Sequence, residues 1–398
     1  MAALAPALSV STYAGELEKA QSDVSALHSI ALRDARDAEK RIRLAYRQYH
    51  LASLTNRPVH FAAVEQSITG LLLDFGPKED ICLLKANVDG RFHRLAGVKE
   101  ALRQCPSLAA GAAGRAISAD VDFQEGRYED ARAALSALIE ESPTWDNLAR
   151  LAHWHSKLGD REAADRLYES AEDELTAKEM RSFAWLELQR GELALSRGDV
   201  DKANVHAARA AASYPGHWKS AEFKAKVLAT AGRLDQAAAL LETVAADQSR
   251  PELHQAIGEL LAALGRAEDA RSWFDSALSD YLASALQGEV HYFHHLADFY
   301  ADSGARPAEG VKWARKDLAL RENFSTQSML AWALYRNGEV REGLHWIKRA
   351  LSSGAQESAL FATAAALYGA AGNPEREAEY ELAARRINPL RPAVHLHL

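Results

Sequence analysis

Hydrophobic residues recur at three- and four-residue spacing along most of the chain, in pairs of short segments separated by a glycine. Residues 324–357 show this pattern most clearly. Their apolar positions are Leu330, Ala331 and Leu334 in the first segment and Val340, Gly343, Ile347 and Ala350 in the second. Such spacing places apolar side chains on one face of a helix. The pattern therefore predicts two amphipathic helices joined by a tight turn at Gly338.

The turn glycine recurs at a nearly constant interval, with two longer intervals that end at Gly198 and Gly304. Glycine adopts at no steric cost the left-handed backbone conformation that commonly ends a helix. One helical hairpin cannot bury both of its apolar faces, so it needs a neighbour on each side. The series therefore predicts a stack of hairpins, with turns at Gly126, Gly159, Gly198, Gly232, Gly265, Gly304, Gly338 and Gly372.

Small residues and prolines fall in phase with these turns. A small residue follows five positions after the glycine at Ala131, Ala164, Ala203, Ala237, Ala270 and Gly343, and prolines stand at Pro106, Pro143, Pro215 and Pro389. This pattern resembles the tetratricopeptide repeat family, whose unit is about 34 residues long. The resemblance covers about residues 112–391, and 75–108 more weakly.

The resemblance implies an all-α fold, a right-handed superhelical solenoid of stacked antiparallel helix hairpins. It divides the chain into an N-terminal helical cap with degenerate repeats at 1–111, the solenoid at 112–391 and a histidine-containing tail at 392–398. Terminal repeats usually depart from the consensus, which is why the weak N-terminal section is expected to cap the stack.

Composition gives no reason to expect nucleic acid or a membrane as a partner. The 47 basic residues are outnumbered by 55 acidic ones, for a net charge of −8, whereas nucleic-acid-binding domains are usually basic. No apolar run approaches the length that a membrane-spanning helix needs. The apolar N-terminal run lacks the basic start of a secretory signal, so a cytoplasmic protein is expected.

The two cysteines, Cys82 and Cys105, lie in the weakest repeat, and no CxxC motif occurs. We interpret them as small buried residues rather than as a disulfide or a redox pair.

In the tetratricopeptide family, the first helix of each repeat lines a concave groove that binds peptides. Counting back from each glycine then selects candidate partner-binding residues: Arg150, His153, His291, His294, His295, Asp298, Asp302, Trp332 and Arg336. The same count selects Asp146, Ala149 and Lys219. Some relatives grip a terminal carboxylate with paired Lys, Asn and Arg, but no asparagine accompanies the basic residues here. Tryptophan and arginine often dominate binding energy, which favours Trp332 and Arg336 as central contacts.

Histidines raise a second hypothesis. His291 and His295 stand four residues apart, a spacing that can chelate one zinc or similar ion from a helix. Asp298 lies about 10 Å along such a helix from His291, too far to share the ion. A third ligand would have to come from a neighbouring helix or from His395 and His397 in the tail. The alternative is an aromatic-rich patch that binds peptide.

Catalytic motifs are missing. Tyr292 follows His291 where an HExxH protease needs glutamate, and no GxSxG or phosphate-binding loop appears. The expected function is a non-enzymatic scaffold or adaptor that holds a peptide or partner helix in its concave groove, without a cofactor. The alternative is a metal-binding scaffold, or an accessory subunit of a metalloenzyme system.

Overall fold

A computed structural model describes residues 12–303, 306–390 and 396, apart from the side chains of Leu32 and Ser303. Over this part of the chain all regular structure is helical and no strand occurs, which confirms the all-α prediction. The helices are α1 (Tyr13–Arg33), α2 (Ala38–Thr55), α3 (Pro58–Phe75), α4 (Glu79–Arg91), α5 (Leu95–Gln104), α6 (Pro106–Ala110), α7 (Ala112–Gln124), α8 (Tyr128–Glu141), α9 (Trp145–Leu158), α10 (Arg161–Asp173), α11 (Met180–Leu195), α12 (Val200–Ser213), α13 (Trp218–Thr230), α14 (Leu234–Asp247), α15 (Pro251–Ala263), α16 (Ala267–Leu286), α17 (Phe293–Ser303), α18 (Pro307–Leu320), α19 (Phe324–Arg336), α20 (Val340–Ser352), α21 (Ser358–Ala370) and α22 (Pro374–Ile387).

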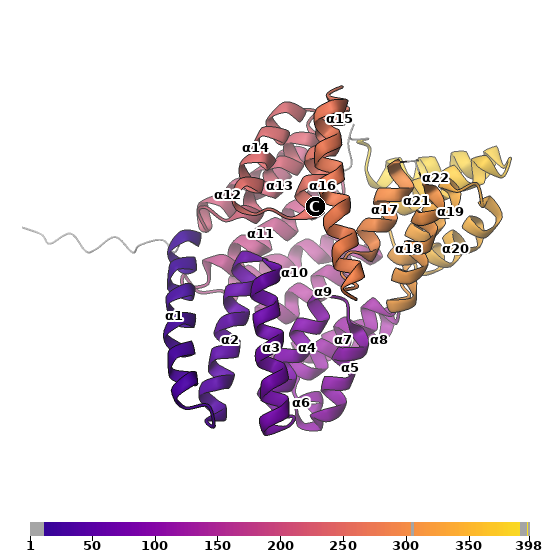
Figure 1. The fold of residues 1–398 in the computed structure, drawn as a ribbon. Coiled ribbons are helices and arrows are strands. Elements are labelled where there is room, and N and C mark those ends of the chain that lie inside the picture. Colours follow the sequence, from indigo (N-terminus) through magenta and orange to yellow (C-terminus); the bar gives the residue numbers. More distant parts are fainter. Residues whose placement is uncertain (1–11, 304–305, 391–395, 397–398) are drawn as a thin grey trace, which may run out of the picture.

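Successive helices from α7 to α22 pack as hairpins, and the hairpins stack into a solenoid (Figure 1). Small residues allow the close packing, since Ala131, Ala164 and Ala203 are fully buried. Of the eight predicted turn glycines, Gly304 lies outside the described residues, and the other seven have φ between 75° and 105°. At Gly338 the next amide, of Glu339, donates to the carbonyl of Leu334 at 2.8 Å and closes the helix end.

The N-terminal section, as far as Gly111, contains the helices α1 to α6 at one end of the stack (Figure 1). Here the interpretation of the cysteines is wrong in one respect. Cys82 and Cys105 are buried, as expected, but they form a disulfide that joins α4 to the junction of α5 and α6. Structural disulfides are rare in cytosolic proteins, so this bridge weighs against the cytoplasmic location, which stays a prediction.

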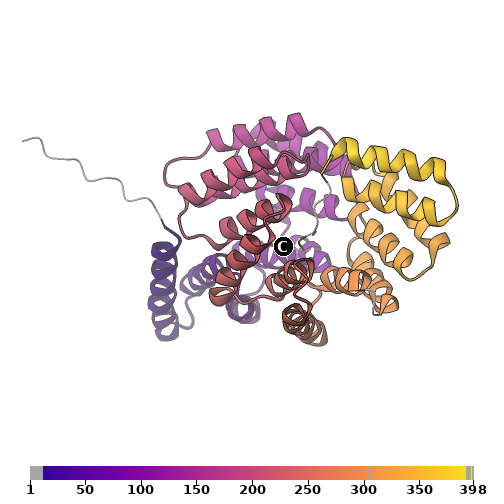
Figure 2. The ribbon, with the colours of Figure 1, turned by 90° about the horizontal axis from the view of Figure 1, so that it is seen from above.

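The solenoid winds until its last hairpins meet its first ones. The Asn323 amide donates to the Gln124 carbonyl at 2.9 Å, before α19 and at the end of α7. The Gln356 backbone N–H donates to the Lys157 carbonyl at 3.0 Å, which brings the start of α21 to the end of α9. In the view from above, the helices surround a common centre (Figure 2). The superhelix thus closes on itself.

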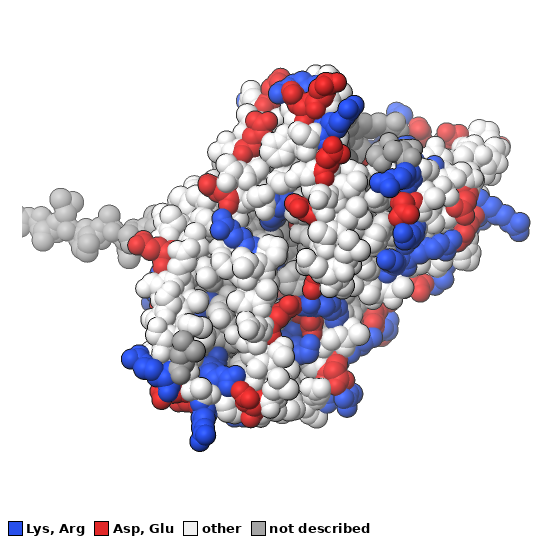
Figure 3. All heavy atoms as spheres, in the orientation of Figure 1, with Lys and Arg blue, Asp and Glu red and all other residues white. Residues whose placement is uncertain are grey.

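The N-terminal helices make a second set of long-range contacts. The Trp218 indole N–H donates to the Leu54 carbonyl at 2.9 Å, and the Tyr13 amide donates to the Pro215 carbonyl at 3.0 Å. These bonds hold α1 and α2 against the start of α13. Both signs of charge are interspersed on the face shown in Figure 3, in keeping with a small net charge. In the described part of the chain, no helix is long and apolar enough to cross a membrane.

Candidate functional site

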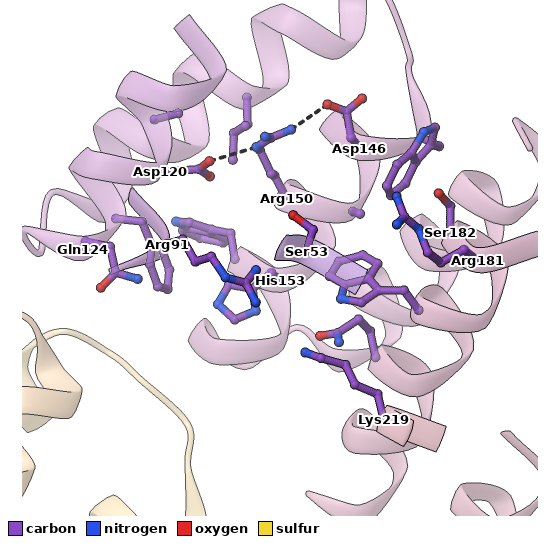
Figure 4. A pocket seen from close by; sticks show the side chains of 18 of the residues that line it. Ser53, Arg91, Asp120, Gln124, Asp146, Arg150, His153, Arg181, Ser182 and Lys219 are labelled. Carbon is purple, nitrogen blue, oxygen red and sulfur yellow. Dashed lines mark hydrogen bonds and ion pairs between the residues drawn. The ribbon is translucent and has the colours of Figure 1, made fainter. Parts of the chain in front are cut away.

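The first helices of four consecutive hairpins, α7, α9, α11 and α13, line a hollow of ≈ 580 Å³ inside the superhelix (Figure 4). Ser53 of α2, Arg91 at the end of α4 and Leu135 of α8 complete its wall. A hollow of this size is typical of ligand sites in proteins. Its boundary therefore combines the regular inner face of the repeats with two residues of the N-terminal helices.

One end of the hollow contains a closed charge network. The Arg150 guanidinium donates to Asp120 Oδ2 at 3.0 Å and to Asp146 Oδ2 at 2.8 Å (Figure 4). Burial raises the pKa of Asp120. Burial opposes ionisation of Asp146 as well, but hydrogen bonds from Thr144 and Arg150 lower its pKa. Two carboxylates thus neutralise Arg150.

The opposite side carries positive charge that no carboxylate contacts directly. Among the described residues, neither Arg91 nor Lys219 has a carboxylate oxygen within 4.0 Å of its charged nitrogens. Arg91 instead donates to the Asn56 side chain and lies 4.9 Å over the Phe61 ring. Burial, and then repulsion by Arg91 and Arg250, lowers the pKa of Lys219 to about 8.

Aromatic side chains form the apolar part of the wall. Trp145 and Trp185 meet edge to face, with ring centroids 6.2 Å apart. Phe123 packs edge to face on His153 at 5.4 Å. Burial lowers the pKa of His153 to about 4 and that of His217 to about 3, so both imidazoles are neutral near pH 7. The hollow therefore combines flat apolar faces, neutral imidazoles and two unneutralised cations.

A sequence model for tetratricopeptide repeats matches residues 188–252, 225–285 and 328–392. These matches cover α12 to α15 and α20 to α22 in full, and parts of α11, α16 and α19. Residues 188–285 and 328–392 thus contain tetratricopeptide repeats. No curated protein matches the chain.

Solved structures resemble the chain at low identity. A chain in the crystal structure of the APC/C hetero-tetramer Cut9–Hcn1 matches with 13% identity and a TM-score of 0.40, covering 94% of this chain and 92% of that one. A chain described in the functional characterisation of Pseudomonas aeruginosa PilF matches with 22% identity and a TM-score of 0.32, covering 54% of this chain and 94% of that one.

The tetratricopeptide register places some predicted residues in the hollow. Arg150 and His153 line it, and so do Asp146, Ala149 and Lys219, which the same count selected. Their role in binding a partner stays a prediction.

The predicted histidine helix is different. Helix α17 begins at Phe293, so His291 lies in the preceding turn and does not share a helical face with His295. The reason is local: α16 extends to Leu286, and Gly288, with φ 87°, begins a connection that reaches Tyr292. His291 stacks on His93 of the α4–α5 turn at 5.8 Å, and His294 meets the same ring at 5.9 Å.

His295 and Asp298, the other residues predicted on the histidine helix, lie within the tetratricopeptide stack. The His295 ring stacks on Tyr281 of the preceding hairpin at 5.4 Å. Asp298 is half-buried in α17, where its charge contributes to raising the pKa of Tyr281, although burial is the larger cause. These contacts join α16 to α17 and lie outside the hollow.

Trp332 and Arg336 connect neighbouring repeats. The Trp332 indole N–H donates to Asp302 Oδ1 at 2.8 Å, and Arg336 Nε donates to the Ala301 carbonyl at 3.0 Å. The guanidinium of Arg336 lies 5.6 Å from the Trp332 ring centroid. Both side chains therefore bond α19 to the end of α17, and neither lines the hollow.

The described part of the structure does not support the metal hypothesis with a set of ligands. Within residues 12–303, 306–390 and 396, no group of three or more His, Cys, Asp or Glu side chains is arranged to hold a metal ion. His395 and His397 lie outside the described residues. Metal binding through His291 and His295 stays a prediction, which elemental analysis of the untagged protein tests.

Several residues of the hollow were not predicted from the sequence, above all Arg91, Trp145 and Trp185. Trp145 begins α9, one position before the first counted site, and is therefore recoverable from the repeat register. Arg91 lies in the degenerate N-terminal section, where no register exists to predict which side chains face inward.

Proposed function

We propose that this protein is a non-enzymatic scaffold that binds an extended peptide segment of a partner protein inside its hollow. The observation that carries the proposal is the hollow itself, ≈ 580 Å³ in volume and lined by the first helices of four consecutive hairpins. No described helix offers a membrane anchor, and the surface charge is mixed, so another protein is the partner that these features favour.

The lining suits a peptide. The Trp145 and Trp185 rings provide flat apolar contact area, and aromatic residues are enriched where binding energy concentrates. Ser182 and Gln189 of α11 add polar groups that can bond a peptide backbone. Arg91 and Lys219 contribute charge that the protein itself leaves unneutralised. A segment of a few residues fills a site of this volume.

Site-specific photocrosslinking tests the location. A photoreactive residue replaces Gln189 in the hollow and, as a matched control, Glu268, which is exposed at the start of α16. In cells of the source organism, we expect crosslinked partner from position 189 and none from position 268. Crosslinking from 268 alone would place the partner on the outside of the solenoid and contradict the proposal.

The Trp332–Arg336 surface is the competing location. If it binds the partner, Trp332→Ala with Arg336→Ala abolishes crosslinking, whereas binding in the hollow predicts that crosslinking from position 189 survives. Because these side chains bond α19 to α17, we expect the double variant to lower the unfolding free energy by about 1–2 kcal/mol. Circular dichroism during urea unfolding measures that loss separately.

A further inference from the structure

We propose that the chain carries a ligand of its own: the Leu396 side chain is docked in the apolar cluster of α13 to α16, where an external apolar segment binds only after Leu396 has left. This cluster includes Trp218, Leu228, Leu241, Leu253, Ile257 and Leu260. None of the described residues in the cluster lines the hollow. Docking of Leu396 thus concerns a second surface, separate from the one that carries the proposed function.

Leu396 is buried although it lies beyond the last helix. Its exposed fraction is 5%, and α22 ends at Ile387. The cluster that it joins combines α13 and α14 with the next hairpin, α15 and α16, and Leu241 and Leu253 in it are fully buried. Burial of one leucine side chain strengthens a contact by about ten-fold or more. A single side chain can therefore anchor the segment that follows α22.

The residues that follow α22 contact the stack in order. The Asn388 side chain donates to the Leu195 carbonyl of α11 at 3.0 Å. At the next turn, a Cβ added to Gly198 would lie 3.1 Å from the Leu390 side chain. Leu396 then joins the cluster of α13 to α16. The contacts therefore advance along the stack from one hairpin to the next.

The link between these contacts is short. From Leu390 to Leu396 the chain spans at most about 22 Å when fully extended. A short tether keeps a side chain near its site at an effective concentration on the order of 1 mM. A free segment with a leucine, or with an apolar side chain of similar size, must exceed that concentration to compete. Docking of Leu396 therefore closes the cluster to external segments.

The helices of the cluster do not need Leu396 in order to form. Each hairpin is held by its neighbours in a stack of this kind, and α13 packs on α14 as α15 packs on α16. Removal of the Leu396 side chain should therefore expose an apolar site and leave α13 to α16 folded. This distinguishes a docked side chain from a core residue such as Leu253, which is part of α15 itself.

A labelled synthetic peptide with the sequence of residues 388–398 is the probe, and its binding to the full-length chain is measured by fluorescence anisotropy. We expect it to bind Leu396→Asp at least about ten-fold more tightly than the natural protein, because a carboxylate disfavours docking of the tethered copy. Leu396→Ala should act in the same direction. A peptide that itself carries Leu396→Asp should bind none of these proteins.

Leu382→Asp is the matched control, because Leu382 is a leucine of α22 that is 51% exposed. It should bind the peptide as weakly as the natural protein does. Circular dichroism checks that the natural protein and the variants have the same helical content.

Photocrosslinking locates the docked side chain. A diazirine residue at position 396 of the full-length chain is expected to crosslink to α13 to α16 of the same chain, and mass spectrometry maps the crosslinked peptides. The same residue at position 382 should give no crosslink to these helices. Crosslinks from position 396 to a second copy, or to other helices, would overturn the intramolecular assignment.

Two anisotropy results would also overturn it. Equal affinity of the peptide for Leu396→Asp and for the natural protein would mean that Leu396 does not occupy the peptide's site. Absence of binding to Leu396→Asp would mean that the cluster does not accept such a segment as a ligand. Neither result bears on the proposed function, which crosslinking of the partner from position 189 tests separately.

Discussion

At the scale of single residues, His153 and His217 show how burial in the hollow determines the protonation state of a side chain. Burial lowers the pKa of His153 to about 4 and that of His217 to about 3. Above pH 6.5 both histidines are largely neutral in the folded and unfolded chain alike. Below pH 6.5 the unfolded chain binds protons that the folded chain does not. Their contribution to stability is therefore complete above pH 6.5 and is lost as the pH falls towards 4.

We expect the unfolding free energy from urea titrations to fall between pH 6.5 and 4 by up to about 1.4 kcal/mol per pH unit for each histidine. Carboxylates elsewhere in the chain act in the same direction. The double variant His153→Phe with His217→Phe isolates the effect, because it should show a shallower pH dependence than the natural protein. Parallel curves for the two proteins would mean that neither imidazole is held neutral by the fold.

Residue positions in the hollow were predictable where the repeat register holds. Counting back from Gly159 finds Arg150 and His153, because a helix repeats its inward face with a fixed period. Arg91 was not predictable. It reaches the hollow only because the N-terminal helices fold against the stack, and no local pattern in residues 75–108 records that arrangement.

At the scale of elements, the turn glycines are of two kinds. Gly126 has φ 77°, and an added Cβ would lie 2.8 Å from the Glu322 carbonyl oxygen of the returning chain. Gly232 has nearly the same φ, 75°, but its Cβ would meet nothing within 4 Å. The first glycine is thus required by backbone conformation and by close approach, and the second by conformation alone.

Gly126→Ala and Gly232→Ala separate these two requirements. Both variants place a side chain in the left-handed region, which costs about 1–2 kcal/mol. Gly126→Ala must also push away a backbone carbonyl that cannot rotate aside, so we expect its loss of unfolding free energy to be larger by about 1 kcal/mol or more. Urea unfolding compares the two directly. Equal losses of unfolding free energy would show that the Glu322 carbonyl moves away from residue 126 without strain.

The elements themselves were largely predictable, because hydrophobic periodicity and turn glycines are local signals. Their ends were less so. The interval between Gly265 and Gly304 is one of the two longer ones, and in the structure α16 takes up extra residues, with a length of 20. That extension moves the start of the next first helix to Phe293. The pair His291 and His295 therefore loses the shared helical face that its spacing suggested.

At the scale of the whole molecule, the decisive feature is closure of the superhelix. The small rotation between adjacent hairpins accumulates over the stack. The size of this rotation cannot be read from the sequence. Contacts between hairpins far apart in the stack, such as Asn323 with Gln124, follow from that accumulated angle. The hollow joins the inner face of α7, α9, α11 and α13 to residues of α2, α4 and α8, so the site was predictable as a face of the repeats and not as a complete volume.

Several polar contacts hold the returning chain at α21 and α22, among them those of Arg161, which donates to the carbonyls of Gln356 at 3.0 Å and Ile387 at 3.1 Å. The Asn388 side chain donates to the Leu195 carbonyl at 3.0 Å, and Lys157 pairs with Glu357. Each hairpin is also held by its neighbours in the stack, as in other solenoids. Asn388→Ala with Lys157→Ala removes two side-chain contacts of this region, and it should therefore loosen the returning turn and leave the hairpins folded.

We expect this double variant to keep its helical content by circular dichroism and to show a larger radius of gyration by small-angle X-ray scattering. Amide hydrogen exchange should quicken at the ends of α9 and α11, where the returning chain covers them. Asn337→Ala is the matched control, because the Asn337 side chain donates to the nearby Glu339 of the same turn. An unchanged radius with unchanged exchange would mean that the remaining contacts, including apolar packing and the hydrogen bonds of Arg161, hold the turns together. An open variant that also binds its peptide faster would show that closure of the superhelix slows entry to the hollow.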